Sequence, residues 1–146
     1  YEIAQCLVGS EMCIRDSIVG FGKAAEITKK HLVHDRAKIE KMDARIVDGL
    51  LSIPDIQLTN PTSSRVPGII SVIVKKRDFH NERYIKHVKH RLAISTGSAC
   101  SAGEPSHVIS AMGLESEVSK ILRISISKNT TDEEVNQLIQ ILRETI

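Results

Sequence analysis

The residue of this sequence best suited to covalent chemistry lies in a loop of small side chains. Cys100 stands in the run Thr-Gly-Ser-Ala-Cys-Ser-Ala-Gly at positions 96–103. No bulky side chain in this run could anchor it to a core, so we expect an exposed and mobile thiol. A helix is predicted to begin near Pro105, and its positive dipole end would favour the thiolate. The alternative is a buried cysteine that serves as a small apolar side chain.

Spacing argues against two other cysteine chemistries. Phosphatases and rhodanese-type sulfurtransferases close an anion-binding loop with an arginine soon after the cysteine. Cys100 is followed instead by Ser, Ala, Gly, Glu, Pro, Ser and His. A Cys-x-x-Cys redox pair is also absent from the sequence. The loop therefore favours a thiol that takes up a group by nucleophilic attack in one site and transfers that group in another.

Composition limits the class of protein. The 146 residues are enough for one domain, and 41% hydrophobic with 26% charged residues is typical of a soluble globular protein. A net charge of +2 does not indicate a nucleic-acid or membrane partner. No apolar run approaches the roughly 20 residues of a membrane span. Three cysteines at unrelated spacings form no disulfide framework, so we expect a reducing, cytoplasmic location.

The first 17 residues do not share the pattern of the rest. They contain the string Cys6-Leu-Val-Gly-Ser-Glu-Met-Cys-Ile-Arg-Asp16, which resembles the translation of a sequencing adapter. We expect residues 1–17 to be non-native or disordered, and we attach no function to Cys6 or Cys13.

Several predicted elements surround the cysteine loop. Apolar residues recur in steps of three, four or seven over residues 18–53, which predicts a long amphipathic helix with Asp43 on its polar face. Pro54 ends that helix. A capping box at residues 131–134 opens a last helix, whose apolar face consists of Val135, Leu138, Ile139 and Leu142.

The remaining elements are short. Helices are predicted over residues 81–92 and 105–112. β-Branched or alternating apolar residues predict strands at residues 56–58, 68–74, 93–96 and 121–127. This order predicts an α/β fold in which helices flank a small mixed sheet.

Several segments, in the same order along the chain, resemble group I cysteine desulfurases. Ser95-Thr-Gly-Ser-Ala-Cys-Ser101 and the following Glu104-Pro-Ser-His-Val-Ile-Ser-Ala-Met-Gly-Leu114 are similar to the family's active-site loop and next helix. The other matching segments are Ile18-Val-Gly-Phe-Gly-Lys-Ala-Ala25, Pro67-Gly-Ile-Ile-Ser-Val72, Ile121-Leu-Arg-Ile-Ser-Ile-Ser127 and Thr130-Thr-Asp-Glu-Glu-Val135. The resemblance covers residues 18–146.

The resemblance implies a particular piece of a particular enzyme. Residues 18–146 would be the C-terminal small domain of a fold-type I, pyridoxal phosphate-dependent, class V aminotransferase. Such enzymes remove sulfur from L-cysteine, release L-alanine and hold the sulfur as a persulfide, here on Cys100, for sulfur-acceptor proteins. Arg123 corresponds to the arginine that binds the substrate α-carboxylate. The complete protein is expected to be a homodimer.

Two departures from the family pattern qualify these expectations. The stretch between Cys100 and Pro105 is a couple of residues shorter than in the family, which leaves the identity of the acceptor open. The family's Ser-x-His-Lys cofactor motif is missing, so we expect the large domain to be absent, no cofactor-binding residue in this chain, and no activity of the chain alone.

Other functions remain open. The chain could be a non-catalytic sulfur-relay or interaction domain, or part of another class V enzyme such as a selenocysteine lyase. The sulfur could supply iron–sulfur cluster assembly, thiolated RNA or DNA phosphorothioation. The histidine pairs His31/His34 and His87/His90 have a spacing that could hold a metal, but no third ligand is evident, so we expect solvated surface and no metal site. We also expect His107 on a helix surface.

Overall fold

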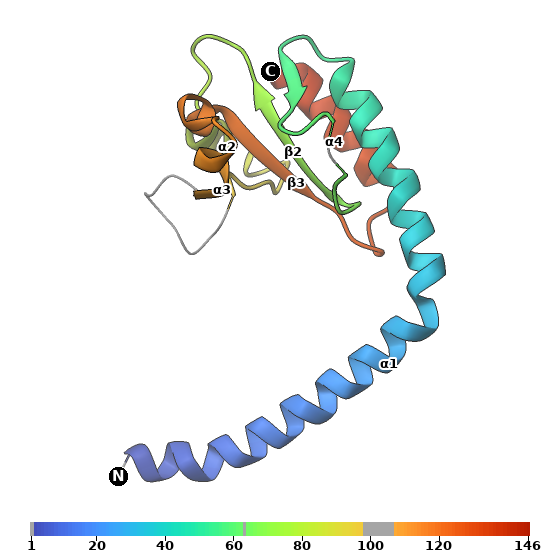
Figure 1. Ribbon diagram of the computed structural model, residues 1–146, viewed down its shortest axis with the longest axis vertical. Helices are drawn as coiled ribbons and strands as arrows, with labels where there is room; N and C mark the ends of the chain where they lie inside the picture. The colour runs from blue at the N-terminus through green and yellow to red at the C-terminus, as the bar shows by residue number, and fades with distance from the viewer. Residues whose placement is uncertain (1, 63, 98–106) are drawn as a thin grey trace. The chain divides into compact units, whose positions relative to one another are not determined.

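The computed structural model of the chain describes residues 2–62, 64–97 and 107–146, with the backbone alone for residues 2–13. The chain divides into two units, residues 1–36 and 37–146. The first unit is part of helix α1, which spans Glu2–Leu51 (Figure 1).

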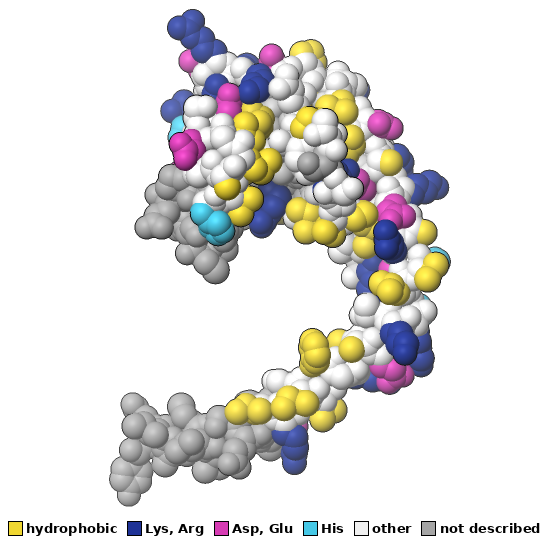
Figure 2. All heavy atoms as spheres, viewed as in Figure 1, with side chains coloured by type: hydrophobic (Ala, Val, Ile, Leu, Met, Phe, Trp, Pro, Cys, Tyr) yellow, Lys and Arg dark blue, Asp and Glu magenta, His cyan; other side chains and the backbone are white. Residues whose placement is uncertain are grey.

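The helix of the first unit begins much earlier than residue 18. The backbone of residues 2–17 is helical, whereas the origin of this segment stays a prediction. The segment has no proline and contains Ala, Leu, Glu, Met and Arg, which are all strong helix formers. Beyond it, large apolar side chains are exposed: Ile18 is 66% exposed, Phe21 77% and Leu32 55%. Figure 2 shows hydrophobic side chains along this helix.

The second unit contains a three-stranded sheet. Its strands are β1 (Ile56–Leu58), β2 (Ile69–Val74) and β3 (Ile121–Ser125), in the order β1-β2-β3. Both pairs of strands are antiparallel, so the expectation of mixed strand directions is wrong for the described sheet. The segment at residues 93–96 is not a regular strand. It meets β3 at a single bridge, where Ser95 and Arg123 exchange two backbone hydrogen bonds of 3.1 and 2.7 Å.

Helices pack on one face of this sheet. The C-terminal part of α1 and helix α4 (Asp132–Thr145) lie together on the same side of β2 and β3 (Figure 1). The most deeply buried side chains come from these elements: Ile46, Leu50, Ile70, Val72, Val74, Leu122, Val135 and Leu142. Each contributes about 1.5–3 kcal/mol by leaving water. The α/β class with a small, helix-flanked sheet is thus confirmed.

Shorter helices complete the second unit. They are α2 (Asn81–Val88), α3 (His107–Ala111) and the 3-10 helix η2 (Glu115–Lys120). Helix α2 ends four residues before the predicted end, and the backbone N–H of Arg91 donates to the carbonyl of Val88 at 2.8 Å in a tighter, i→i−3 turn. The hydroxyl groups of Tyr84 and Thr145, 2.6 Å apart, join α2 to the end of α4.

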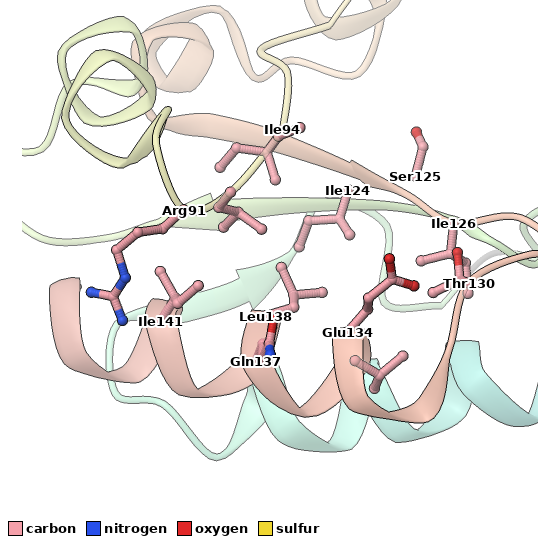
Figure 3. A pocket seen from close by; sticks show the side chains of 13 residues that line it. Arg91, Ile94, Ile124, Ser125, Ile126, Thr130, Glu134, Gln137, Leu138 and Ile141 are labelled. Carbon is pink, nitrogen blue, oxygen red and sulfur yellow. The ribbon is translucent and has the colours of Figure 1, made fainter.

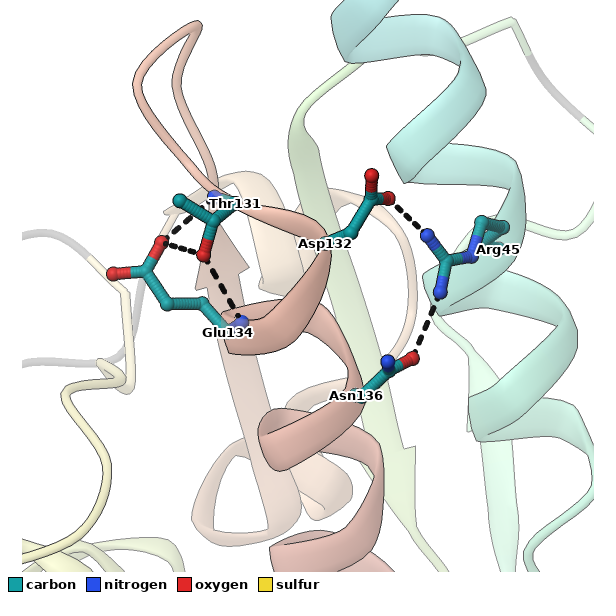
Figure 4. A network of polar contacts seen from close by, with 5 residues as sticks. All are labelled: Arg45, Thr131, Asp132, Glu134 and Asn136. Carbon is teal, nitrogen blue, oxygen red and sulfur yellow. Dashed lines mark hydrogen bonds and ion pairs between the residues drawn. The ribbon is translucent and has the colours of Figure 1, made fainter.

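The start of α4 has the predicted capping box. The backbone N–H of Glu134 donates to the Thr131 hydroxyl at 3.2 Å, and the backbone N–H of Thr131 donates to the Glu134 carboxylate at 2.7 Å (Figure 4). Arg45 of α1 braces the same turn, since its guanidinium pairs with Asp132 and donates to the Asn136 side chain at 2.8 Å. An N-cap of this kind is worth about 1 kcal/mol.

Candidate active site

Arg123 lies in the middle of β3, which is one of the two edge strands of the described sheet. Its neighbours Leu122 and Ile124 point into the core, so alternation places the Arg123 side chain on the opposite face. Arg123 is directly opposite Ser71 of β2, and on its other side it pairs with Ser95. Backbone pairing on both sides fixes the position from which the Arg123 side chain projects out of the sheet.

The electrostatics of Arg123 favour an anionic ligand. Its Nε is buried and makes no hydrogen bond with any described residue. The ion pairs of the described residues likewise join other cations to carboxylates, not Arg123. A half-buried guanidinium with an unsatisfied N–H is suited to bind a carboxylate, to which it can donate two parallel hydrogen bonds. This environment is more consistent with the predicted substrate-binding role of Arg123 than with that of a solvated surface arginine.

Cys100 lies outside the described residues, together with the rest of residues 98–106. Its exposure and its position beside a helix start therefore stay predictions. The described chain does lead directly to it, since Ser95, which is hydrogen-bonded to Arg123, precedes it by five residues. At no more than about 3.6 Å per residue, the Cα atom of Cys100 lies within about 18 Å of that of Ser95.

A buried carboxylate anchors the strand opposite Arg123. Asp43 of α1 is only 6% exposed, so the prediction that it lies on the polar face of the helix is wrong. It pairs with both terminal nitrogens of the Arg65 guanidinium and accepts the backbone N–H of Gly68 at 2.8 Å. The hydrogen bond to Asp43 raises the pKa of Arg65 above its ordinary value. This Asp43 clamp joins α1 to the residue before β2 and so sets the position of that strand.

Gly68 is a requirement of the clamp. Its φ of +89° is unfavourable for other residues, and a Cβ atom there would lie 2.9 Å from Cγ2 of Ile39 and 3.3 Å from the carbonyl oxygen of Ile126. The sequence signal that could have revealed the clamp is Arg65-x-Pro-Gly directly before a strand, with an aspartate on the preceding helix.

The described residues do not fit a pyridoxal phosphate site. Such a site needs a lysine directed at the cofactor, a group that stacks on the ring and a cradle for the phosphate. Among the described lysines only Lys120 is even half-buried, and its ammonium lies 3.8 Å from the carboxylate of Glu117.

A cavity of about 310 Å³ lies elsewhere, between α4, β3 and residues 91–94 (Figure 3). Its walls combine apolar and polar side chains, and Arg123 is not among the residues that line it. Two charged side chains at its border are engaged in the fold, since Arg91 pairs with Glu144 and Glu134 caps α4. The cavity is separate from the Arg123 site.

The histidines lie where the sequence predicts. His31, His34, His87, His90 and His107 are all exposed. Within the described ranges no group of three His, Cys, Asp or Glu residues could hold a metal ion. No helix of the described residues is both long and apolar enough to cross a membrane.

The family follows from the sequence match. The model of the aminotransferase class-V family matches residues 9–138, which include most of the long helix, the sheet and Arg123. The chain belongs to the class V aminotransferase family. The match begins before residue 18, inside the helix that extends through the N-terminal segment.

Curated relatives of this class V chain bear the name cysteine desulfurase, as the sequence motifs predict. The probable mitochondrial cysteine desulfurase of Schizosaccharomyces pombe is 36% identical over 126 residues, which cover 84% of this chain and 25% of that protein. The cysteine desulfurase IscS of Aeromonas hydrophila is 34% identical over 132 residues, covering 88% of this chain and 32% of that protein. The chain thus spans about a quarter to a third of the relatives' length.

Solved structures agree with this fold. The NifS-like protein from Rickettsia africae superimposes with a TM-score of 0.76 at 22% identity, over 88% of this chain and 33% of that one. A second NifS-like protein gives a TM-score of 0.71 at 24% identity, over 87% of this chain and 32% of that one. The fold of this chain is therefore also found within these NifS-like proteins.

Proposed function

We propose that this chain is the small domain of a pyridoxal phosphate-dependent cysteine desulfurase, in which Cys100 takes sulfur from L-cysteine. Residues 18–146 would form that domain, and the cofactor would be held by residues outside this chain. The observation that carries the proposal is Arg123, a half-buried arginine with an unsatisfied Nε, hydrogen-bonded through its backbone to the segment that leads to Cys100.

The proposed chemistry divides between the two residues. Arg123 binds the substrate α-carboxylate and fixes the orientation of the substrate. The Cys100 thiolate attacks the substrate sulfur, so that an S–S bond forms and the C–S bond breaks. The electron pair of that bond stays on the carbon, which takes a proton to give L-alanine. Cys100 then carries the terminal sulfur as a persulfide for an acceptor protein.

Several features of the proposed whole protein rest on its relatives. The relatives named cysteine desulfurase support L-cysteine as substrate, and the family supports the cofactor. We further propose a homodimer, as the family resemblance implies, and a cytoplasmic location, because three cysteines at unrelated spacings form no disulfide framework.

The test uses the complete protein with the cofactor-binding domain restored. We expect L-cysteine to yield alanine and a persulfide on Cys100, detected by mass spectrometry after alkylation. Cys100→Ala should abolish the persulfide while the visible absorption of the cofactor is unchanged. A Cys100→Ala protein that still forms a persulfide would refute the assignment. A protein that accepts a persulfide from a donor but releases no alanine would support the sulfur-relay alternative instead.

A further inference from the structure

Four polar side chains form a row across the sheet, at the level of Arg123. Strand pairing places Arg123 opposite Ser71 on one side and Ser95 on the other. The row continues to Thr59, whose backbone N–H donates to the carbonyl of Ser71 at 3.0 Å. Directly opposed residues of antiparallel strands share a face, with Cβ atoms about 4.5–5.5 Å apart. Ser71 and Ser95 therefore flank the Arg123 side chain on the face away from the core.

The two hydroxyl groups at one end of the row are not equivalent. The Oγ1 atom of Thr59 lies 2.9 Å from the Oγ atom of Ser71, and either could donate by distance alone. Thr59 is 9% exposed, whereas Ser71 is only half-buried. A buried donor left without a partner costs more than an accessible one, and among the described residues Ser71 is the partner of the Thr59 hydroxyl. We therefore assign Thr59 as the donor, which leaves the hydroxyl hydrogen of Ser71 available.

Two donors then project from paired strand positions, and among the described residues neither has an acceptor. One is the Ser71 hydroxyl, and the other is the guanidinium of Arg123, with its buried and unsatisfied Nε. The row of four contains no acidic side chain that could pair with them. A carboxylate is acceptor-only and has about four lone-pair sites, so one ligand carboxylate can satisfy both donors.

Resting on the proposed role of Arg123, we propose that Ser71 is a second residue that binds the α-carboxylate of the amino-acid ligand. Thr59 is the positioning residue that turns the Ser71 hydroxyl toward that ligand. Arg123 alone leaves the carboxylate free to tilt about its bidentate axis. A hydroxyl from the neighbouring strand restricts the tilt, and with it the direction in which the rest of the amino acid points.

The experiment uses the full 146-residue chain and the side-chain Nε–Hε resonance of Arg123, which is assigned by its loss in Arg123→Lys. The probe is L-alanine, and L-alaninamide at equal ionic strength is the control without a carboxylate. We expect a saturable shift of the resonance with L-alanine but not with L-alaninamide. Ser71→Ala should raise the dissociation constant about tenfold, as expected for one hydrogen bond to a charged group. Thr59→Val should raise it by a smaller factor, about threefold.

Matched variants separate binding from folding. Ser125→Ala removes an exposed hydroxyl from the same strand and face as Arg123 and should leave the dissociation constant unchanged. Ser71→Thr and Ser71→Val have the same shape and differ in the hydroxyl, so they serve if Ser71→Ala disturbs the fold. We expect the Thr variant to bind several-fold more tightly than the Val variant. If the Thr and Val variants have equal dissociation constants while binding still depends on Arg123, the proposed role of Ser71 is refuted and that of Arg123 is not. No saturable shift in the unsubstituted chain would overturn the carboxylate role of Arg123 as well.

Discussion

Replacing Asp43 tests how the Asp43 clamp holds β2 in place. In Asp43→Ala the Arg65 guanidinium, which is 21% exposed, loses its ion pair, and the Gly68 N–H loses its acceptor. Breaking a fully buried pair costs about 3–5 kcal/mol, but Arg65 remains partly hydrated, so the ionic part must be reduced. The unsatisfied Gly68 N–H adds about 1–3 kcal/mol. Together we expect the free energy of unfolding to fall by about 2–4 kcal/mol.

The assay is urea denaturation of the chain, followed by far-ultraviolet circular dichroism. Asp43→Asn should cost less, about 1–2 kcal/mol, because its amide oxygen can still accept the Gly68 N–H. The matched control is Asp132→Asn, which removes another aspartate–arginine pair that joins α1 to a distant segment. Asp132 is 75% exposed, and exposed pairs contribute less than about 1 kcal/mol. If Asp43→Ala costs no more than Asp132→Asn, the clamp does not anchor β2 and the reasoning is wrong.

Three other predictions follow from features of the second unit and its proposed function. Hydrogen bonds from the Thr131 backbone and side chain lower the pKa of Glu134 below 4.5, so its contribution to stability is complete above pH 4.5 and is lost as the pH falls through the lowered pKa. Glu134→Gln should therefore reduce the fall in stability between about pH 5 and pH 3 seen by thermal unfolding, and an unchanged pH profile would contradict this. Arg123→Ala in the complete enzyme should weaken substrate capture by on the order of tenfold or more, measured as the L-cysteine concentration for half-maximal alanine release; an unchanged value would exclude carboxylate binding. Pyridoxal phosphate added to this chain should give only scattered, borohydride-reducible lysine adducts by mass spectrometry, and one stoichiometric site with alanine release would disprove the expectation.

Local signals in the sequence predicted most of the regular structure. The apolar period predicted a helix over residues 18–53, and the observed helix ends at Leu51. β-Branched residues predicted β2, and the capping box predicted the start of α4. These features depend on residues close together in sequence. The segment at residues 93–96 has strand-like composition but pairs at Ser95 alone, because the extent of pairing depends on the path of the chain relative to β3.

The parts that sequence reasoning missed depend on contacts between distant residues. Periodicity placed Asp43 on the solvent face of its helix, yet the loop before β2 folds over that face and buries it. The Thr59–Ser71 hydroxyl pair follows from strand register, which composition does not define. Arg123 could be identified only through a family motif, since its isolated signal was that of a polar residue on a strand.

The bridge between Ser95 and Arg123 also determines how often the proposed nucleophile meets its substrate. Because Ser95 is fixed beside the arginine, the cysteine five residues later is confined to a sphere of at most about 18 Å around that point. One thiol in such a volume corresponds to an effective concentration on the order of tens of millimolar. Any substitution that opens the two backbone hydrogen bonds of the bridge would enlarge that volume and dilute the thiol at the carboxylate site, even if both functional side chains were intact.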